Sequence, residues 1–178
     1  MEFDYVIVGG GSAGCVLANR LSADPKVTVC LLEAGGEDRN PWIHIPAGYI
    51  KTMVNPSLNW LFETQPHPKT GNRPIPVPRG KVLGGSSAIN AMLYVRGQAQ
   101  DYDTWAQMGC RGWSFEDVLP YFKRAEHREQ GADAYHGQGG PLNVTLPTQR
   151  YDILDKVIAA GGALGYPMDQ DYNGADQS

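Results

Sequence analysis

The sequence predicts an α/β fold that opens on a β-α-β unit, and three observations support this prediction. Residues 4–9 form a short, nearly continuous apolar run, which is typical of a parallel strand buried on both faces. A glycine cluster and a helical pattern follow, and a second β-rich run ends at residue 33. Beyond this unit we expect long irregular and helical insertions, and a domain that is incomplete at its carboxyl end.

The helix of this unit is predicted over residues 12–23. Apolar residues recur there at helical spacing up to Leu21, and Pro25 ends the pattern. The second strand is predicted over residues 26–33, where valine and leucine predominate. The β-α-β unit therefore spans residues 4–33, with a right-handed crossover.

The regular alternation of strand and helix stops after this unit. Residues 36–80 are rich in proline, tryptophan and asparagine and have no sustained periodicity, so we expect an irregular, lid-like segment. A buried helix is predicted over residues 86–95 and a short amphipathic helix over residues 101–108.

A longer helix is predicted over residues 114–127, with Ser114 as its cap and Asp117 completing a capping box. Pro120 lies inside this span, so the helix either starts late or is kinked. A glycine-rich loop over residues 129–141, a strand over 141–146 and a helix over 151–164 complete the chain. We assign residues 1–145 to the amino-terminal part of a nucleotide-binding domain, and residues 146–178 to the truncated start of a helical, substrate-domain segment.

The composition argues for a small-molecule partner. Lysine and arginine number 15 against 19 acidic residues, and the charges are scattered, so we expect no nucleic-acid partner. The three cysteines have neither disulfide nor zinc spacing, which favours a reducing, cytoplasmic location and no metal site. No apolar run is long enough to span a bilayer, and the acidic first residues do not resemble a signal peptide.

Residues 9–14 have the pattern G-x-G-x-x-G at the point where strand meets helix. Gly9 permits the tight turn, and Gly14 lets the helix pack closely on the strand. The absence of a side chain at Gly11 lets a pyrophosphate reach backbone N–H groups at the helix start, where Ser12 and Ala13 lie. Glu33 ends the second strand and can accept hydrogen bonds from both ribose hydroxyls, with Ala34 beside it.

This arrangement is a dinucleotide-binding fingerprint of the Rossmann type. The alternative, a simple glycine turn beside a surface glutamate, does not account for three glycines at this spacing. A glutamate repels a 2′-phosphate, so NADP is the least favoured ligand. FAD and NAD remain open at this point.

A second glycine cluster lies in the segment RGKVLGGSSAINAMLYVRG, residues 79–97. This segment resembles the first signature of the glucose–methanol–choline (GMC) oxidoreductase family, and the match continues to Asp103. Other stretches are similar to the same family, especially its choline and alcohol dehydrogenase-like members, among them EAGG after the second strand, DYDTW from residue 101 and HGQGGPL from residue 136. The resemblance covers essentially the whole chain and favours FAD over NAD.

The resemblance implies that residues 79–97 form a wall beside the flavin. Two adjacent glycines allow the backbone to approach a planar ring, Ser86 can donate to pyrophosphate oxygens, and Asn90 can donate and accept. Trp60 is either an adenine-side contact or a packing residue. The expected FAD-binding residues are Gly9, Gly11, Ser12, Ala13, Gly14, Glu33, Ala34, Trp60, Arg79, Val82, Gly84, Gly85, Ser86, Asn90, Ala91, Met92 and Leu93.

Some family members tether the flavin through a histidine just before the signature asparagine. That position is Ile89 here, so we expect FAD to be held without a covalent bond. The family's catalytic histidine lies near the carboxyl terminus of much longer chains. The histidines of this chain match none of the family's catalytic positions, so no catalytic residue is assigned within it: His44, His67, His127 and His136.

The resemblance implies that the full-length protein oxidises the CH–OH group of choline or a primary alcohol, passing hydride to flavin N5. We expect a quinone or another acceptor rather than oxygen to take the electrons, and attachment to the periphery of the inner membrane is an alternative to a free cytoplasmic location. Two other interpretations are open. One is an NAD-dependent dehydrogenase, which the broken β-α alternation disfavours, and the other is a non-catalytic nucleotide-binding fragment.

Overall fold

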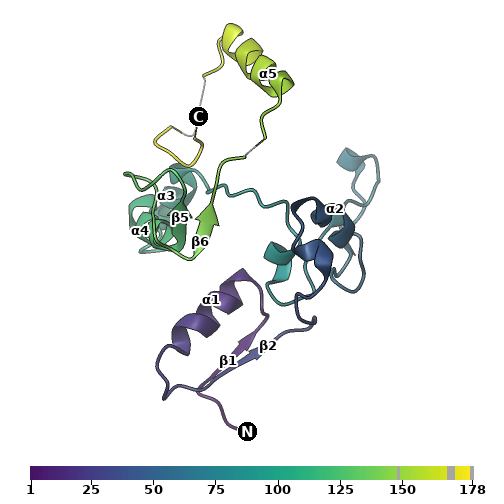
Figure 1. Ribbon diagram of the computed structural model, residues 1–178, viewed down its shortest axis with the longest axis vertical. Coiled ribbons are helices and arrows are strands. Elements are labelled where there is room, and N and C mark those ends of the chain that lie inside the picture. The colour runs from purple at the N-terminus through teal and green to yellow at the C-terminus, as the bar shows by residue number, and fades with distance from the viewer. Residues whose placement is uncertain (148, 168–170, 177–178) are drawn as a thin grey trace. The chain divides into compact units, whose positions relative to one another are not determined.

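The computed structural model describes residues 1–147, 149–167 and 171–176 (Figure 1). The chain divides into two compact units, Met1–Leu93 and Tyr94–Ser178. The predicted division near residue 145 concerns the domains of the full-length protein and stays a prediction.

The first unit opens on the predicted β-α-β arrangement, in which α1 lies alongside the strands (Figure 1). Strand β1 (Tyr5–Val8) pairs in parallel with β2 (Val29–Leu32), and helix α1 (Ser12–Leu21) connects them. In this register Ile7 lies opposite Leu31. The α/β fold class and the positions of these three elements are confirmed.

Residues 36–80 contain only short elements, as their composition predicts. Helix α2 and the antiparallel strands β3 and β4 are accompanied by single turns of 3-10 helix. Their bounds are Pro41–Ile43 (η1), Pro46–Gly48 (η2), Tyr49–Thr52 (α2), Phe62–Glu63 (β3), Pro68–Thr70 (η3) and Pro76–Val77 (β4). A small apolar core of Leu58, Val82 and Ile89 joins this segment to the second glycine motif.

The prediction of a helix over residues 86–95 is wrong. The segment forms one turn of 3-10 helix, η4 (Gly85–Ala88), and then runs without regular structure from residue 91 to residue 98. Gly84, Gly85 and Met92 all have positive φ, at 93°, 59° and 59°, and a right-handed helix cannot pass through such residues. Leu93 is 83% exposed instead of buried.

The second unit contains three helices and one pair of parallel strands among its described residues. The elements are α3 (Ala99–Gln107), α4 (Phe115–Ala125), β5 (Glu126–Arg128), β6 (Leu142–Val144) and α5 (Asp152–Ala163). The predicted helices over 101–108 and 151–164 and the strand over 141–146 are confirmed at these positions.

Helix α4 also keeps its predicted start. Ser114 and Asp117 form the capping box, and Pro120 lies inside the helix instead of delaying it. The predicted end at residue 127 is wrong, because α4 stops at Ala125 and the next three residues form β5. Glu126, at this transition, is fully buried.

A buried ion pair stabilises the interior of the second unit. Arg96 Nη2 lies 2.8 Å from Glu126 Oε2, and both side chains are almost completely buried. Arg96 also donates to the carbonyl of Tyr135 at 2.6 Å and packs over the rings of Tyr94 and Phe122. No helix in the described part of the chain combines the length and the apolar character that a membrane crossing requires.

Candidate functional site

The first glycine loop brings strand β1 into direct contact with helix α1. A Cβ atom built on Gly14 would overlap the carbonyl oxygen of Gly9, so only glycine permits this approach. Gly11 is the N-cap of α1, with no side-chain cap and no acidic residue in the first helical turn. The N–H groups of that turn are therefore available to an anionic ligand.

Glu33 braces the same loop from the end of β2. One carboxylate oxygen accepts a hydrogen bond from the N–H of Gly10 at 2.7 Å, and the other accepts one from the N–H of Gly35 at 2.8 Å. Each carboxylate oxygen has a further lone pair, so Glu33 can still accept from a ribose hydroxyl. Gly10, which the sequence analysis did not select, is thus part of the site through its backbone.

The second glycine motif packs directly on the first. The N–H of Gly84 donates to the carbonyl of Gly10 at 2.7 Å, and a Cβ atom on Gly85 would lie 2.7 Å from the Cα of Gly11. A side chain therefore cannot be accommodated at Gly85. Two motifs separated by about seventy residues therefore form one continuous glycine-rich surface.

A cavity of about 650 Å³ lies at this surface, against the ends of β1 and β2. Trp60 and Phe62 stack in it with their ring centroids 5.9 Å apart, and Lys81 Nζ lies 4.7 Å from the Trp60 centroid. Its wall is formed by Val8, Gly9, Gly11, Leu32, Glu33, Ala34, Trp60, Phe62, Arg79, Gly80, Gly85 and Ser86. We call it the larger cavity.

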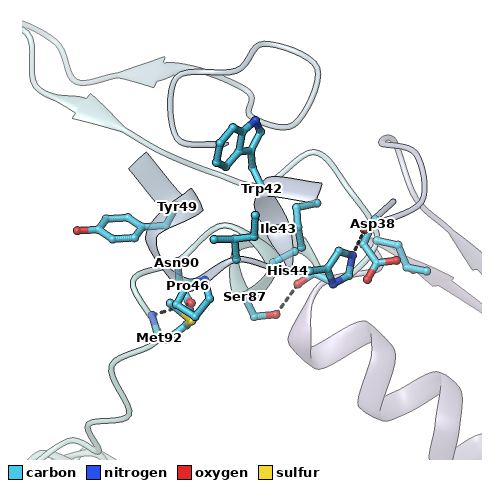
Figure 2. A pocket seen from close by; sticks show the side chains of 13 residues that line it. Asp38, Trp42, Ile43, His44, Pro46, Tyr49, Ser87, Asn90 and Met92 are labelled. Atoms are coloured by element: carbon cyan, nitrogen blue, oxygen red, sulfur yellow. Dashed lines mark hydrogen bonds between the residues drawn. The ribbon is translucent and has the colours of Figure 1, made fainter. Parts of the chain in front are cut away.

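A second cavity of about 290 Å³ lies in the same unit (Figure 2). The Ser87 hydroxyl donates to the carbonyl of Gly84 at 2.5 Å, and His44 Nε2 lies 2.6 Å from the carbonyl oxygen of Asp38. Its wall is formed by Asp38, Trp42, Ile43, His44, Ile45, Pro46, Tyr49, Leu83, Gly84, Ser87, Ala88, Asn90 and Met92. We call it the smaller cavity.

The structure brings most of the expected FAD-binding residues to these two walls. The larger cavity collects Gly9, Gly11, Glu33, Ala34, Trp60, Arg79, Gly85 and Ser86, and the smaller cavity collects Gly84, Asn90 and Met92. Those on neither wall are Ser12, Ala13, Gly14, Val82, Ala91 and Leu93. Val82 is completely buried in the apolar core, whereas the N–H groups of Ser12 and Ala13 belong to the open helix start.

Sequence reasoning missed most of the smaller cavity. Trp42, His44 and Tyr49 come from η1, its C-cap and α2, inside the segment that was predicted only to be irregular. Asn40 caps η1 by accepting from the N–H of Trp42, and a proline follows as the first helical residue. This Asn-Pro pair is the local signal that could have located the turn.

Each histidine has a structural role in the described chain. His67 caps η3 by accepting from the N–H of Lys69, and His127 accepts from the N–H of Gly139. His136 is buried between carboxylates, with its ring nitrogens 2.9 Å from Asp133 and 3.4 Å from Asp171. None of these three lines either cavity.

The fold and the paired glycine motifs define a Rossmann-like nucleotide-binding unit. The family model for GMC oxidoreductases matches residues 3–178, and the chain belongs to the GMC oxidoreductase family.

The curated relatives of the chain include oxygen-dependent choline dehydrogenases. The chain is 47% identical over 177 residues to an oxygen-dependent choline dehydrogenase of Sinorhizobium fredii, covering 99% of this chain and 32% of the relative. It is 48% identical to a protein of the same name from Photobacterium profundum, covering 98% of this chain and 31% of the relative. The chain thus spans about a third of the length of these relatives.

Solved structures agree in fold. Pyridoxine 4-oxidase from Mesorbium loti superposes with a TM-score of 0.87 at 40% identity, covering 93% of this chain and 33% of that one. A formate oxidase superposes with a TM-score of 0.83 at 28% identity, covering 97% and 32% respectively.

Proposed function

We propose that the full-length protein is an FAD-dependent oxidoreductase that acts on the CH–OH group of a small alcohol, and that this chain supplies much of the FAD-binding surface. The observation that carries the proposal is the direct contact between the two glycine motifs, which joins an open helix start to two cavities in one unit. A dinucleotide has the matching parts, since its charged centre links two ring systems.

The larger cavity suits the adenosine end of FAD. The free N–H groups at the start of α1 favour a diphosphate, and Arg79 adds a positive charge on the same wall. Glu33 has lone pairs left for the ribose hydroxyls. The stacked rings of Trp60 and Phe62 offer a flat apolar face for adenine.

The smaller cavity and the adjoining residues 90–93 suit the flavin end. Gly84, which has positive φ, has no side chain and so lets this wall approach a planar ring closely. Asn90 and Met92 contribute to the same wall.

The proposal includes non-covalent attachment of FAD. Ile89 occupies the position of the tethering histidine found in some family members, and its side chain is 3% exposed in the core with Leu58 and Val82. It has no nucleophilic atom, and burial keeps it away from the cavity walls. No flavin bond can form at this position.

FAD, when bound, supplies the redox chemistry by accepting a hydride from the carbinol carbon. The role of this chain is to bind and orient the cofactor through the glycine surface. We assign to it no residue that takes the hydroxyl proton, because three of its four histidines lie off both cavities and His44 is bonded to the backbone of Asp38. That proton acceptor is expected elsewhere in the full-length protein.

The sequence and the names of the relatives indicate different electron acceptors. The dehydrogenase-like stretches predict a quinone or another non-oxygen acceptor, whereas the curated relatives are named as oxygen-dependent and the two similar solved structures are oxidases. The alternative of an NAD-dependent dehydrogenase is disfavoured because the described part of the first unit has no further βαβ repeat after β2.

The test is to purify the full-length protein and assay choline and primary alcohols in two ways. One assay follows reduction of an artificial dye without oxygen, and the other follows oxygen consumption without dye. Dye reduction that depends on the alcohol is the expected result, and the ratio of the two rates identifies the acceptor class. An NAD⁺-dependent rate with no dye reduction would contradict the proposal.

A further inference from the structure

We infer that Asn90 is a positioning residue: its side-chain oxygen holds the backbone of Met92 in the left-handed conformation, and this turn sets the wall against which the flavin rests. The inference rests on the proposed function. It changes the role of Asn90, however, from a direct contact with the cofactor to a residue that shapes the backbone around it.

The geometry of the turn supports this role. Asn90 Oδ1 accepts a hydrogen bond from the N–H of Met92 at 2.9 Å, which closes an Asx turn. Met92 has φ of 59°, a region that a residue with a Cβ atom disfavours. Such a conformation persists only where its surroundings impose it, and positions of this kind cluster at functional sites.

The hydrogen bond between Asn90 and Met92 is the local restraint on the turn, as the neighbouring residues show. On one side Ile89 is anchored in the apolar core, whereas on the other side Leu93 is 83% exposed and lies in irregular backbone. Both Asn90 and Met92 line the smaller cavity (Figure 2). The N–H of Ala91, between them, has no hydrogen-bond partner in the described chain and is therefore open to a ligand.

The same device occurs at the larger cavity. Asn59 Oδ1 accepts from the N–H of Leu61 at 3.0 Å, and Leu61 has φ of 54°. Trp60, the residue between them, lines the larger cavity. Each cavity therefore has one wall built on an asparagine that holds the second following residue in the left-handed conformation.

The test is a double-mutant cycle in the full-length protein. Glycine adopts positive φ at no steric cost, so Met92→Gly removes the need for the restraint. The variants are Asn90→Ala, Met92→Gly and the two combined, with Asn90→Ala/Leu93→Gly as the control for added flexibility outside the turn. The readouts are the dissociation constant of FAD, titrated into deflavinated protein, and the visible spectrum of the bound flavin.

We expect Asn90→Ala to weaken FAD binding by about five- to tenfold, the effect of one net hydrogen bond, and to change the flavin spectrum. The combined variant should return to within about twofold of Met92→Gly alone, because glycine at position 92 adopts the turn whether or not Asn90 restrains it. The control variant should stay as weak as Asn90→Ala.

A combined variant that is about five- to tenfold weaker than Met92→Gly would overturn the inference, since Asn90 would then contact the flavin directly. Rescue by Leu93→Gly as well would also overturn it, because flexibility rather than the turn would be responsible. A wild-type protein that binds no FAD at all would instead overturn the proposed function, and the inference with it.

Discussion

Gly11 and Gly14 lie in the same loop but face different neighbours. A Cβ atom on Gly14 would overlap the carbonyl oxygen of Gly9, whereas one on Gly11 would have only an ordinary contact, 3.9 Å from the Cα of Gly85. Gly11 also has φ of −78°, which any residue can adopt. Gly14 therefore serves the packing of the fold, whereas Gly11 keeps open the space in which we propose that the diphosphate of FAD binds.

Adding a methyl group at Gly11 should therefore affect FAD binding, whereas adding one at Gly14 should affect the stability of the fold. Gly11→Ala in the full-length protein should weaken FAD binding by about tenfold or more while leaving the unfolding temperature of the FAD-free protein nearly unchanged. Gly14→Ala should lower that temperature, through a loss of about 1–3 kcal/mol from overpacking. Flavin titration and thermal unfolding of both variants measure the two effects. Equal effects of the two variants on unfolding would contradict the assignment.

The environment of Asp133 predicts that the stability of the protein falls in acid. Burial alone would raise the pKa of its carboxyl, but hydrogen bonds from the N–H of Tyr135 and from His136 outweigh it and hold the pKa at about 2, below the ordinary value of 3.8. A lowered pKa means that the stabilisation is present above pH 3.8 and is lost as the pH falls toward 2.

The corresponding experiment compares wild type with Asp133→Asn by denaturant unfolding across that range. Asparagine keeps an acceptor oxygen but does not titrate, so the stability difference between the two proteins should shrink as the pH falls from 3.8 to 2. Because the Asp133 side chain is 46% exposed, we expect solvent to reduce the size of this difference. Curves that stay parallel over this range would show that the hydrogen bonds of Asp133 do not favour its charged form.

At the scale of elements, local patterns predicted the β-α-β unit and helices α3, α4 and α5. Each of these has its own signal, such as the capping box of Ser114 and Asp117. The predicted helix over residues 86–95 does not form, because the residues that favour turns outweigh the apolar spacing on which the prediction rested. Gly84, Gly85 and Asn90 all favour turns, and two of them carry positive φ.

Strand β5 shows what sequence alone could not supply. The helical pattern continues through Glu126 and His127, yet α4 ends at Ala125 because Glu126 pairs with Arg96, thirty residues away in the chain. The β5 strand then pairs with β6, which begins at Leu142. The smaller cavity was missed for a similar reason, since its wall joins residues from the irregular segment to the second glycine motif.

The buried Arg96–Glu126 pair is predicted to contribute strongly to the stability of the protein. Arg96→Met would leave a carboxylate buried without its partner, so the free energy of unfolding should fall by about 3–5 kcal/mol. Arg39→Met is the matched control, because Arg39 and Glu37 form a pair whose side chains are largely exposed, and a change of about 1 kcal/mol or less is expected. Denaturant unfolding of the two variants gives both values. A loss at Arg96 no larger than that at Arg39 would contradict the structural role of the pair.

At the scale of the whole molecule, the two glycine motifs meet at the carboxyl ends of β1 and β2. Val8 and Leu32, which are 84% and 51% exposed, lie at the ends of β1 and β2 and form part of the larger cavity. The carboxyl ends of parallel strands are where ligands bind in open α/β sheets. The sequence predicted this edge from Gly9 and Glu33, but the stacking partner Phe62 became evident only in the structure.

Acid precipitation of the purified full-length protein tests the central claim most directly, because it reports both the identity of the cofactor and its attachment. The visible spectrum and the mass of the released compound are measured in the supernatant, and the pellet is examined for colour. Non-covalent binding at the glycine surface predicts FAD in the supernatant and a colourless pellet. The absence of flavin from both the supernatant and the pellet would contradict FAD binding. Flavin that stays in the pellet would contradict the non-covalent attachment of FAD.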